Sequence, residues 1–159
     1  MAVFHAAPDG TINVLQFPRF DYPLQTLLTA YGPPNDVYVF VQDILPVNTE
    51  RDYEVLLEYR DQGMLVMYSG STFVGEPIAV CPSLLAPAAR APEIWSWSPD
   101  MGLTLADIAK KYTGGFDDLS YYLPISEAAG FSPSEFYERF KVESDKDDCF
   151  SVVNPYVGK

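Results

Sequence analysis

The chain has 159 residues, 48% of them apolar and 14% aromatic, which is enough to build a hydrophobic core and excludes a wholly disordered protein. Acidic residues outnumber basic ones by 22 to 10, and the net charge of −12 argues against a protein that binds nucleic acid or anionic membranes. No apolar run approaches the ~20 residues that a membrane-spanning helix requires, so no transmembrane segment is predicted.

The first hundred residues predict a short helix followed by a β-meander. Residues 1–20 are expected to be irregular, apart from a strand at 11–17 that Pro18 ends. Residues 23–31 predict a helix, because apolar residues recur there at the spacing of one helix face and Gly32 with two prolines stops it. Further strands are predicted at residues 36–44, 53–60, 64–69, 77–81 and 93–97.

The clearest hairpin joins the strands at 53–60 and 64–69 through a three-residue loop that ends in Gly63. With Gly63 in the left-handed conformation, this loop sets a register in which Tyr59 pairs with Leu65. One face of the hairpin is then wholly apolar. The other, called here the mixed face, combines apolar and charged side chains: Glu54, Leu56, Glu58, Arg60, Met64, Val66 and Tyr68.

The last third of the chain is predicted to be helical. Thr104 and Ser132 are each followed, three residues later, by an acid and then by apolar residues, which is the pattern of a capping box. Both are expected to begin a helix, with a shorter helical turn at 126–129. An acidic stretch and a possible last strand at 150–157 complete the chain.

Together these elements predict a single domain of the α+β class. We expect an antiparallel sheet of four to five strands, a short helix before it, and C-terminal helices packed on one face. The chain divides into an irregular segment at 1–20, a helix and β-meander at 22–100, a helical part at 103–142 and a tail or strand at 143–159.

No catalytic, cofactor-binding or metal-binding residues are predicted. The single histidine, His5, has no recognisable nucleophile motif to serve, and the glycine pair at 114–115 lacks the surrounding pattern of a phosphate-binding loop. Residues 143–147 alternate acids as a calcium loop does at its start. However, Asp148 stands where the loop requires glycine and Asn154 where it requires the closing glutamate, so a solvated acidic loop is expected.

Two aromatic pairs have alternative interpretations. Trp95 and Trp97 lie on one face of a predicted strand, where they could stack against a sugar or, as we expect, belong to the core. Of Tyr121 and Tyr122, one is expected to be buried, because adjacent side chains of a strand point in opposite directions.

The mixed face is the predicted partner surface. Its members Leu56, Glu58, Met64, Val66 and Tyr68 would form an exposed apolar patch rimmed by charges, and such patches mark interaction sites. Another protein, or a second copy of the chain, could bind there. The alternative is that the C-terminal helices cover this face.

The two cysteines, Cys81 and Cys149, are 68 residues apart and form no metal or redox motif. They are either two buried thiols or one disulfide that ties the C-terminal segment to the sheet. A disulfide would require an oxidising compartment.

The order of elements over residues 22–70 resembles that of small outer-membrane lipoproteins of the SmpA/OmlA type and of β-lactamase-inhibitor-like domains. The resemblance consists of a helix that ends in a Tyr-Gly-Pro-Pro sequence at 31–34, a strand, a loop and the hairpin around Gly63. The whole chain is more similar to a lipoprotein-like family of filamentous Chloroflexi-type bacteria. The similar stretches are 31–38, 62–70, 97–109 and 123–140, with Cys149 beyond them.

The resemblance implies a cellular location for the protein and does not imply a reaction. Proteins of that family resemble mature domains that follow a lipobox signal, and their two cysteines suggest a disulfide. We therefore expect a non-enzymatic, extracytoplasmic interaction or scaffold domain if the chain is a mature form, and a cytoplasmic protein otherwise. The alternatives are a cytoplasmic acidic binding or inhibitor protein and a carboxylate-based hydrolase, which would need two acids about 5–10 Å apart in a deep pocket.

Overall fold

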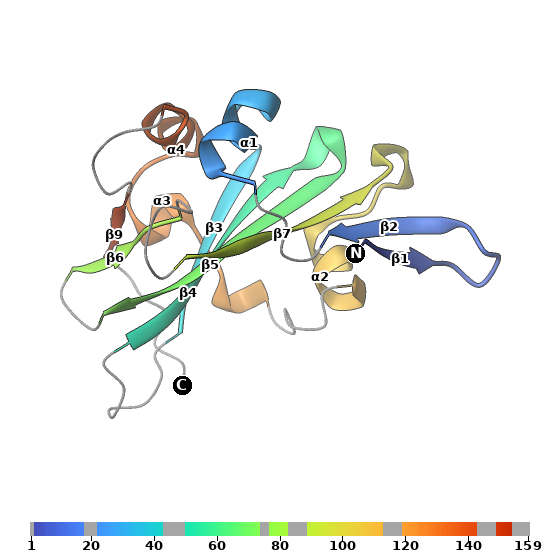
Figure 1. The fold of residues 1–159 in the computed structure, drawn as a ribbon, viewed down its shortest axis with the longest axis horizontal. Coiled ribbons are helices and arrows are strands. Elements are labelled where there is room, and N and C mark those ends of the chain that lie inside the picture. Colours follow the sequence, from blue (N-terminus) through green and yellow to red (C-terminus); the bar gives the residue numbers. More distant parts are fainter. Residues whose placement is uncertain are drawn as a thin grey trace.

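The computed structural model describes residues 2–17, 22–42, 50–73, 77–82, 89–112, 119–142 and 149–153. A twisted antiparallel sheet of seven strands in the order β1-β2-β7-β5-β4-β3-β8 runs through the molecule, and a second sheet pairs β6 with β9 (Figure 1). The strands are β1 (Val3–Ala6), β2 (Ile12–Phe17), β3 (Asp36–Val41), β4 (Glu50–Tyr59), β5 (Met64–Phe73), β6 (Ile78–Val80), β7 (Ala89–Trp97), β8 (Leu123–Pro124) and β9 (Phe150–Val152). The α-helices are α1 (Leu24–Tyr31), α2 (Leu105–Tyr112), α3 (Ile125–Ala128) and α4 (Pro133–Phe140).

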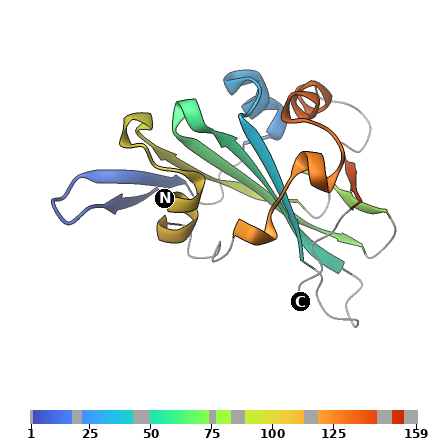
Figure 2. The ribbon, with the colours of Figure 1, turned by 180° about the vertical axis from the view of Figure 1, so that it is seen from behind.

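The α+β class and the antiparallel sheet are as predicted, but two finer expectations are wrong. The main sheet has seven strands, because the short strands β1 and β8 extend it at its two ends. The helices lie on both faces, because the apolar stripe of α2 packs against the side opposite α1, α3 and α4 (Figures 1 and 2). Part of the segment 1–20 is also regular, since β1 and β2 form a hairpin there.

The predicted helix starts are confirmed by their hydrogen bonds. The Ser132 hydroxyl accepts from the backbone N–H of Glu135, whose carboxylate accepts from the backbone N–H of Ser132 at 2.7 Å. Thr104 and Asp107 make the same reciprocal pair at the start of α2. In each case the capping box satisfies N–H groups that the first helical turn leaves without an intrahelical partner.

The first hydrophobic core fills the space between one face of the sheet and the helices α1, α3 and α4. In α1, Leu24, Leu27 and Leu28 are all fully buried, and each such side chain stabilises the fold by about 1.5–3 kcal/mol. Phe136 and Phe140 of α4 are equally buried. The small β6–β9 sheet closes this core with Ile78, Val80, Phe150 and Val152.

A second core lies on the opposite face, under α2. Trp95 and Trp97 of β7 are 1% and 6% exposed there and pack with Ile108 of α2 and Leu56 of β4. The main sheet is therefore covered on parts of both faces. This arrangement explains why its central strands carry apolar residues at successive positions and not only at alternate ones.

The register of the β4–β5 hairpin differs from the predicted one by a single residue. Tyr59 pairs with Met64 and Leu57 with Val66, because a 3₁₀ turn at Arg60–Gln62 and then Gly63 make the connection four residues long. A one-residue shift moves every side chain of a strand to the other face. Met64, Val66 and Tyr68 therefore join the first core, and Leu65 joins the second.

Three tyrosines of this hairpin anchor the elements that cover the first core. The hydroxyl groups of Tyr68 and Tyr59 donate to the carbonyl oxygens of Tyr22 and Gly32, just before and just after α1, at 3.0 and 3.2 Å. The hydroxyl group of Tyr53 donates to the carbonyl oxygen of Cys81, which follows β6, at 2.6 Å. The three rings are at most 1% exposed, so these bonds satisfy phenols that would otherwise be buried without partners.

We expect the free energy of unfolding to fall as the pH rises above about 10. Burial raises the pKa of Tyr53 to about 12 and raises those of Tyr59 and Tyr68 further, whereas all three ionise near pH 10 in the unfolded chain. The three tyrosines contribute fully to stability at pH values below the pKa that they have in the unfolded chain. As the pH rises from there toward their pKa in the folded protein, each tyrosine lowers the free energy of unfolding by about 1.4 kcal/mol per pH unit.

Urea unfolding at a series of alkaline pH values would measure this slope. The variant Tyr68→Phe, which removes one ionisable phenol, should show a shallower slope than the wild type. A free energy of unfolding that stays constant as the unfolded-state phenols ionise would contradict the expectation.

Candidate functional site

The structure does not place the predicted partner surface on the outside of the molecule. Met64, Val66 and Tyr68 lie on one face of the sheet and Leu56 on the other, and all four belong to the hydrophobic cores. The fifth member, Glu58, is 3% exposed. The mixed face as predicted does not exist, for two reasons. The wrong hairpin register placed Met64, Val66 and Tyr68 on the wrong face, and Leu56 is covered by the second core under α2, in line with the alternative that C-terminal helices cover this face. Neither a partner nor a second copy can dock on these residues in the folded state.

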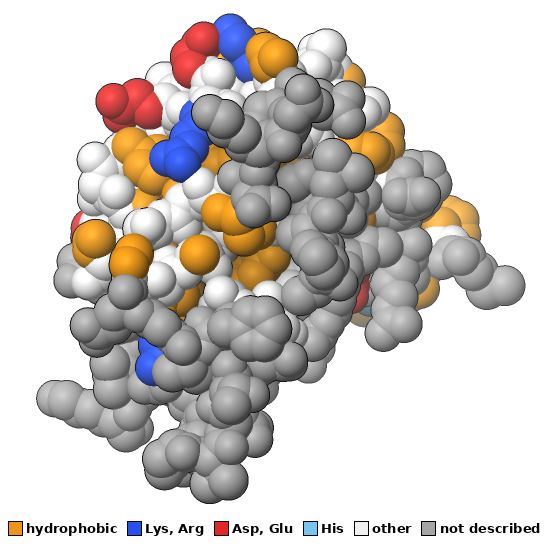
Figure 3. Space-filling model, turned by 60° about the vertical axis from the view of Figure 1, so that its left-hand side comes forward, with side chains coloured by type: hydrophobic (Ala, Val, Ile, Leu, Met, Phe, Trp, Pro, Cys, Tyr) orange, Lys and Arg blue, Asp and Glu red, His pale blue; other side chains and the backbone are white. Residues whose placement is uncertain are grey.

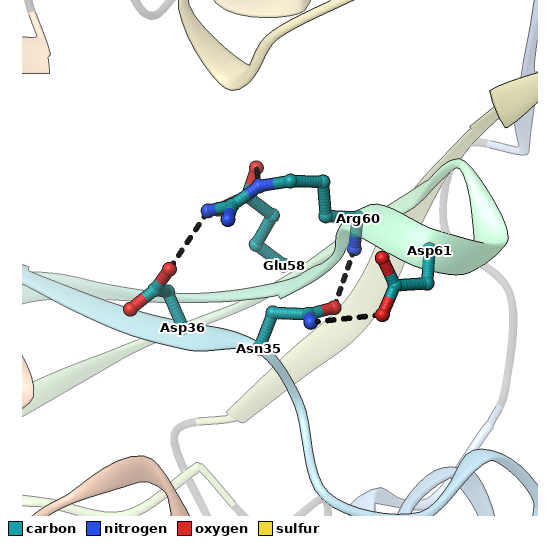
Figure 4. Close-up of polar contacts among 5 residues, drawn as sticks. All are labelled: Asn35, Asp36, Glu58, Arg60 and Asp61. Carbon is teal, nitrogen blue, oxygen red and sulfur yellow. Dashed lines mark hydrogen bonds and ion pairs between the residues drawn. The ribbon is translucent and has the colours of Figure 1, made fainter. Parts of the chain in front are cut away.

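A charged network closes the end of this hairpin (Figure 4). The Arg60 guanidinium group donates to Asp36 Oδ2 at 2.8 Å and to the two carboxylate oxygens of Glu58 at 2.9 and 3.3 Å. Asn35 adds two bonds: its side-chain oxygen accepts from the backbone N–H of Arg60 at 2.7 Å, and its amide donates to Asp61 at 3.4 Å. The network joins the start of β3 to the hairpin turn.

Arg60 neutralises the one charged side chain that is buried among the described residues. Glu58 is almost inaccessible, whereas the Arg60 side chain is 58% exposed and covers it. Hydrogen bonds and charge from Glu58, followed by those from Asp36, raise the pKa of the guanidinium group above its usual range. Since both carboxylates are already engaged with Arg60, the arrangement is suited to holding the turn rather than to binding a charged substrate.

We expect Arg60→Ala to lower the free energy of unfolding by about 2 kcal/mol, because it leaves the Glu58 carboxylate buried without its cation. Chemical unfolding should show a smaller loss when the same change is made in a Glu58→Gln background, since no buried charge then remains. Lys141→Ala, which removes the exposed pair between Lys141 and Glu138, is the control and should leave stability nearly unchanged. Equal losses in both backgrounds would refute the proposed role of Arg60.

Three of the four aromatic candidates are part of the second core. The burial of Trp95 and Trp97 removes the sugar-stacking interpretation. Tyr122 is 9% exposed and Tyr121 is 40% exposed, so one of this pair is buried as expected, although Tyr121 ends a 3₁₀ turn and does not belong to a strand. The Tyr122 hydroxyl donates to Glu54, and the ring contacts Phe40 with centroids 5.3 Å apart.

No metal cluster is evident among the described residues. No group of three or more histidine, cysteine, aspartate or glutamate side chains there could hold a metal ion. The glycine pair at 114–115 and the acidic stretch at 143–148 lie outside the described residues. In the described part of the chain, no helix has the length and apolar character needed to span a membrane.

A shallow depression of about 540 Å³ lies between α1 and the residues that follow α4. The face drawn in Figure 3 carries scattered apolar side chains with a few acidic and basic ones between them. The depression is wide open to solvent and lined by Gln25, Thr26, Thr29, Ala30, Lys141 and Val142. The only charged side chain in this lining, Lys141, pairs with Glu138 at 2.7 Å. Four of the six lining residues are polar, but a hollow this open does not enclose a ligand as a small-molecule site does.

The two cysteines form a disulfide, which is the second of the alternatives left open by the sequence. Cys81 directly follows β6 and Cys149 directly precedes β9, and their Cα atoms are 4.0 Å apart. Backbone carbonyls on both sides accept further hydrogen bonds: that of Cys81 from the Tyr53 hydroxyl and that of Cys149 from the Arg139 guanidinium, each at 2.6 Å. The disulfide holds the C-terminal strand β9 against the first core.

Among the described residues, the most exposed large apolar side chains on the strands of the main sheet belong to the β1–β2 hairpin. Phe4 is 62% exposed, Ile12 52% and Val3 42%. Val3 and Phe4 are successive residues of β1, so they point to opposite faces of the sheet. The turn is fixed by Gly10, whose φ of 86° favours glycine, and by an aspartate, Asp9, that accepts the backbone N–H of Thr11 at 2.9 Å.

This hairpin projects beyond the rest of the molecule (Figures 1 and 2). Only β2 is attached to the body, through pairing of residues 14–17 with β7. Along the other edge of β1, no strand pairs among the described residues. The sequence predicted the strand at 11–17 but no strand before it. The signal that could have revealed β1 is the set of β-forming residues on both sides of an Asp-Gly turn.

Comparison with known proteins identifies no relative: no family model, curated protein or solved structure matches this chain.

Proposed function

We propose that this protein is a non-enzymatic interaction domain that works outside the cytoplasm and contacts another polypeptide through its β1–β2 hairpin. The exposed apolar side chains Phe4, Ile12 and Val3 are the observation that carries the proposal. Exposed apolar residues on a projecting hairpin gain free energy when a partner removes them from water.

The disulfide supports the location. Disulfides persist in oxidising compartments and are rare in the reducing cytosol. Here the bond between Cys81 and Cys149 closes the first core, and the described residues contain no free cysteine. A protein of the cell envelope or of the extracellular space would retain this bond.

The location is tested by counting free thiols in protein taken from its native host under alkylating conditions and then denatured without reductant. Zero free thiols are expected, together with monomeric mobility on a non-reducing denaturing gel. Two free thiols per chain would remove the argument for an oxidising compartment.

The interaction is tested by placing a photo-crosslinking amino acid at position 4 and irradiating the native host. A covalent adduct with a second polypeptide is expected at position 4. The matched control is position 142, because Val142 is as exposed as Phe4, at 64%, but lies at the end of α4. The proposal fails if position 4 gives no adduct, or if it gives no more than position 142.

A further inference from the structure

We infer that the polypeptide bound by the hairpin is a second copy of this chain, paired antiparallel through β1 about a two-fold axis centred near Phe4. This inference rests on the proposed function of the hairpin and names its partner. Three features of the described residues lead to it: the backbone edge of β1, the side chains that flank that edge, and the absence of charge around it.

The first feature is the backbone. β1 is the terminal strand of a sheet in which every pairing is antiparallel. Among the described residues nothing pairs with its outer edge, so that edge presents backbone groups whose best partner is another extended strand. An identical β1 supplies such a strand without any rearrangement, and a two-fold axis makes the contact self-complementary.

The second feature is the side-chain pattern. An axis perpendicular to the sheet at Phe4 sets Phe4 opposite its own copy and Val3 opposite His5, because paired residues point to the same face. The two large exposed apolar side chains of β1 would then be shielded on both faces of the joined sheets. Aromatic pairs opposite each other stabilise antiparallel strands by up to about 1 kcal/mol.

The third feature is charge. Residues 2–17 contain one acid, Asp9, and neither lysine nor arginine, although the whole chain carries 22 acids and a net charge of −12. A basic partner would find almost no opposite charge to bind on this hairpin. A second copy presents an equally uncharged edge, and the projection of the hairpin keeps the two acidic bodies apart (Figure 1).

The dimer is expected to be weak. β1 has only four residues, and its pairing with β2 is irregular between His5 and Ala6, which shortens the usable edge. An interface of this size falls at the lower end of specific protein–protein contacts. Added salt should not dissociate the dimer, because it screens the repulsion between two acidic bodies and weakens no apolar contact.

Sedimentation velocity of the purified full chain, over about a hundredfold range of concentration, tests this inference. We expect a monomer–dimer equilibrium whose dissociation constant rises by at least about tenfold in Phe4→Glu, because two carboxylates would then face each other across the axis. The matched control, Val142→Glu, places the same charge on an equally exposed valine outside the hairpin and should leave the equilibrium unchanged. Circular dichroism and urea unfolding would verify that both variants retain the fold.

A chain that stays monomeric at every concentration would overturn the inference, as would a dimer that Phe4→Glu leaves intact. The photo-crosslinking experiment separates this failure from that of the proposed function. An adduct at position 4 with a different polypeptide would refute only the second copy as partner. The absence of any adduct, together with a monomer in solution, would refute both.

Discussion

Removal of the disulfide by the double change Cys81→Ser and Cys149→Ser is expected to lower the free energy of unfolding by about 4 kcal/mol. The two cysteines are 68 residues apart, and a cross-link over a loop of that length restricts the unfolded chain strongly. The folded state loses a restraint as well, because β9 would then be held by its pairing with β6, by the burial of Phe150 and Val152, and by hydrogen bonds at its two ends. A loss of this size is a large fraction of the stability of a typical domain.

Urea unfolding of the double variant and of the reduced wild-type protein would measure this effect, and the two should agree. Hydrogen exchange should also be faster in β9 of the variant than in the central strands β4 and β5, since β9 is the element that the disulfide restrains. A double variant within about 1 kcal/mol of the oxidised wild type would show that native packing, and not the cross-link, holds β9.

Substitution of Gly63 by alanine is the second change expected to have a large effect, a loss of about 4 kcal/mol. Gly63 has a φ of 59° and is buried where the β4–β5 turn meets the end of β7. An added Cβ would overlap the carbonyl oxygen of Trp97 and lie 3.2 Å from the side chain of Pro99. Relief of that overlap would break the bond from the Trp97 N–H to the Gly63 carbonyl, which is 2.8 Å long.

Gly102→Ala provides the matched control. Gly102 has a φ of 62°, nearly the same as Gly63, but a Cβ at this position would meet no atom within 4 Å. Replacement of Gly102 by alanine should therefore lower the free energy of unfolding by about 1 kcal/mol, because alanine disfavours the left-handed conformation. Chemical unfolding would compare the two variants. If the two losses were equal, the contact with Trp97 would have no energetic importance.

The local elements follow from short-range features of the sequence. The apolar spacing in residues 23–31 and the capping boxes at Thr104 and Ser132 predicted α1, α2 and α4, and all three are present. A helix that begins at a cap and buries a stripe of apolar residues needs no distant contact to be recognised. The same holds for the strands around residues 53–60, where β-forming residues predominate.

The register of the β4–β5 hairpin could not be predicted from short-range features of the sequence. The residues around Gly63 allow a loop of three or of four residues, and both place apolar side chains on each face of the strand. The observed choice depends on distant groups: Asn35 accepts the N–H of Arg60, and Trp97 donates to Gly63. It also requires the second core, which lets Leu65 be buried on the face opposite Val66.

The candidate site, like the register, depended on contacts that the local sequence does not reveal. The sequence favoured an interaction domain but placed its surface on residues that the fold buries. An error of one residue in register exchanges the inside and outside of a strand, which accounts for Met64, Val66 and Tyr68, whereas Leu56 is covered by the second core. Of the β1–β2 hairpin, by contrast, only the strand at 11–17 was predicted, and the residues before it were expected to be irregular. Whether Val3 and Phe4 are covered depends on which elements reach the end of the sheet, and no local pattern contains that information.

By itself, the sequence determined the class of the fold, its antiparallel character, the starts of its helices and the absence of recognisable catalytic motifs. These features depend on periodicity, capping and residue type within a few positions. Only the tertiary structure decided the sheet order, the two-sided core, the bond between Cys81 and Cys149 and the exposure of the β1–β2 hairpin. Each of these depends on contacts between segments far apart in the chain, which form only when the whole chain packs.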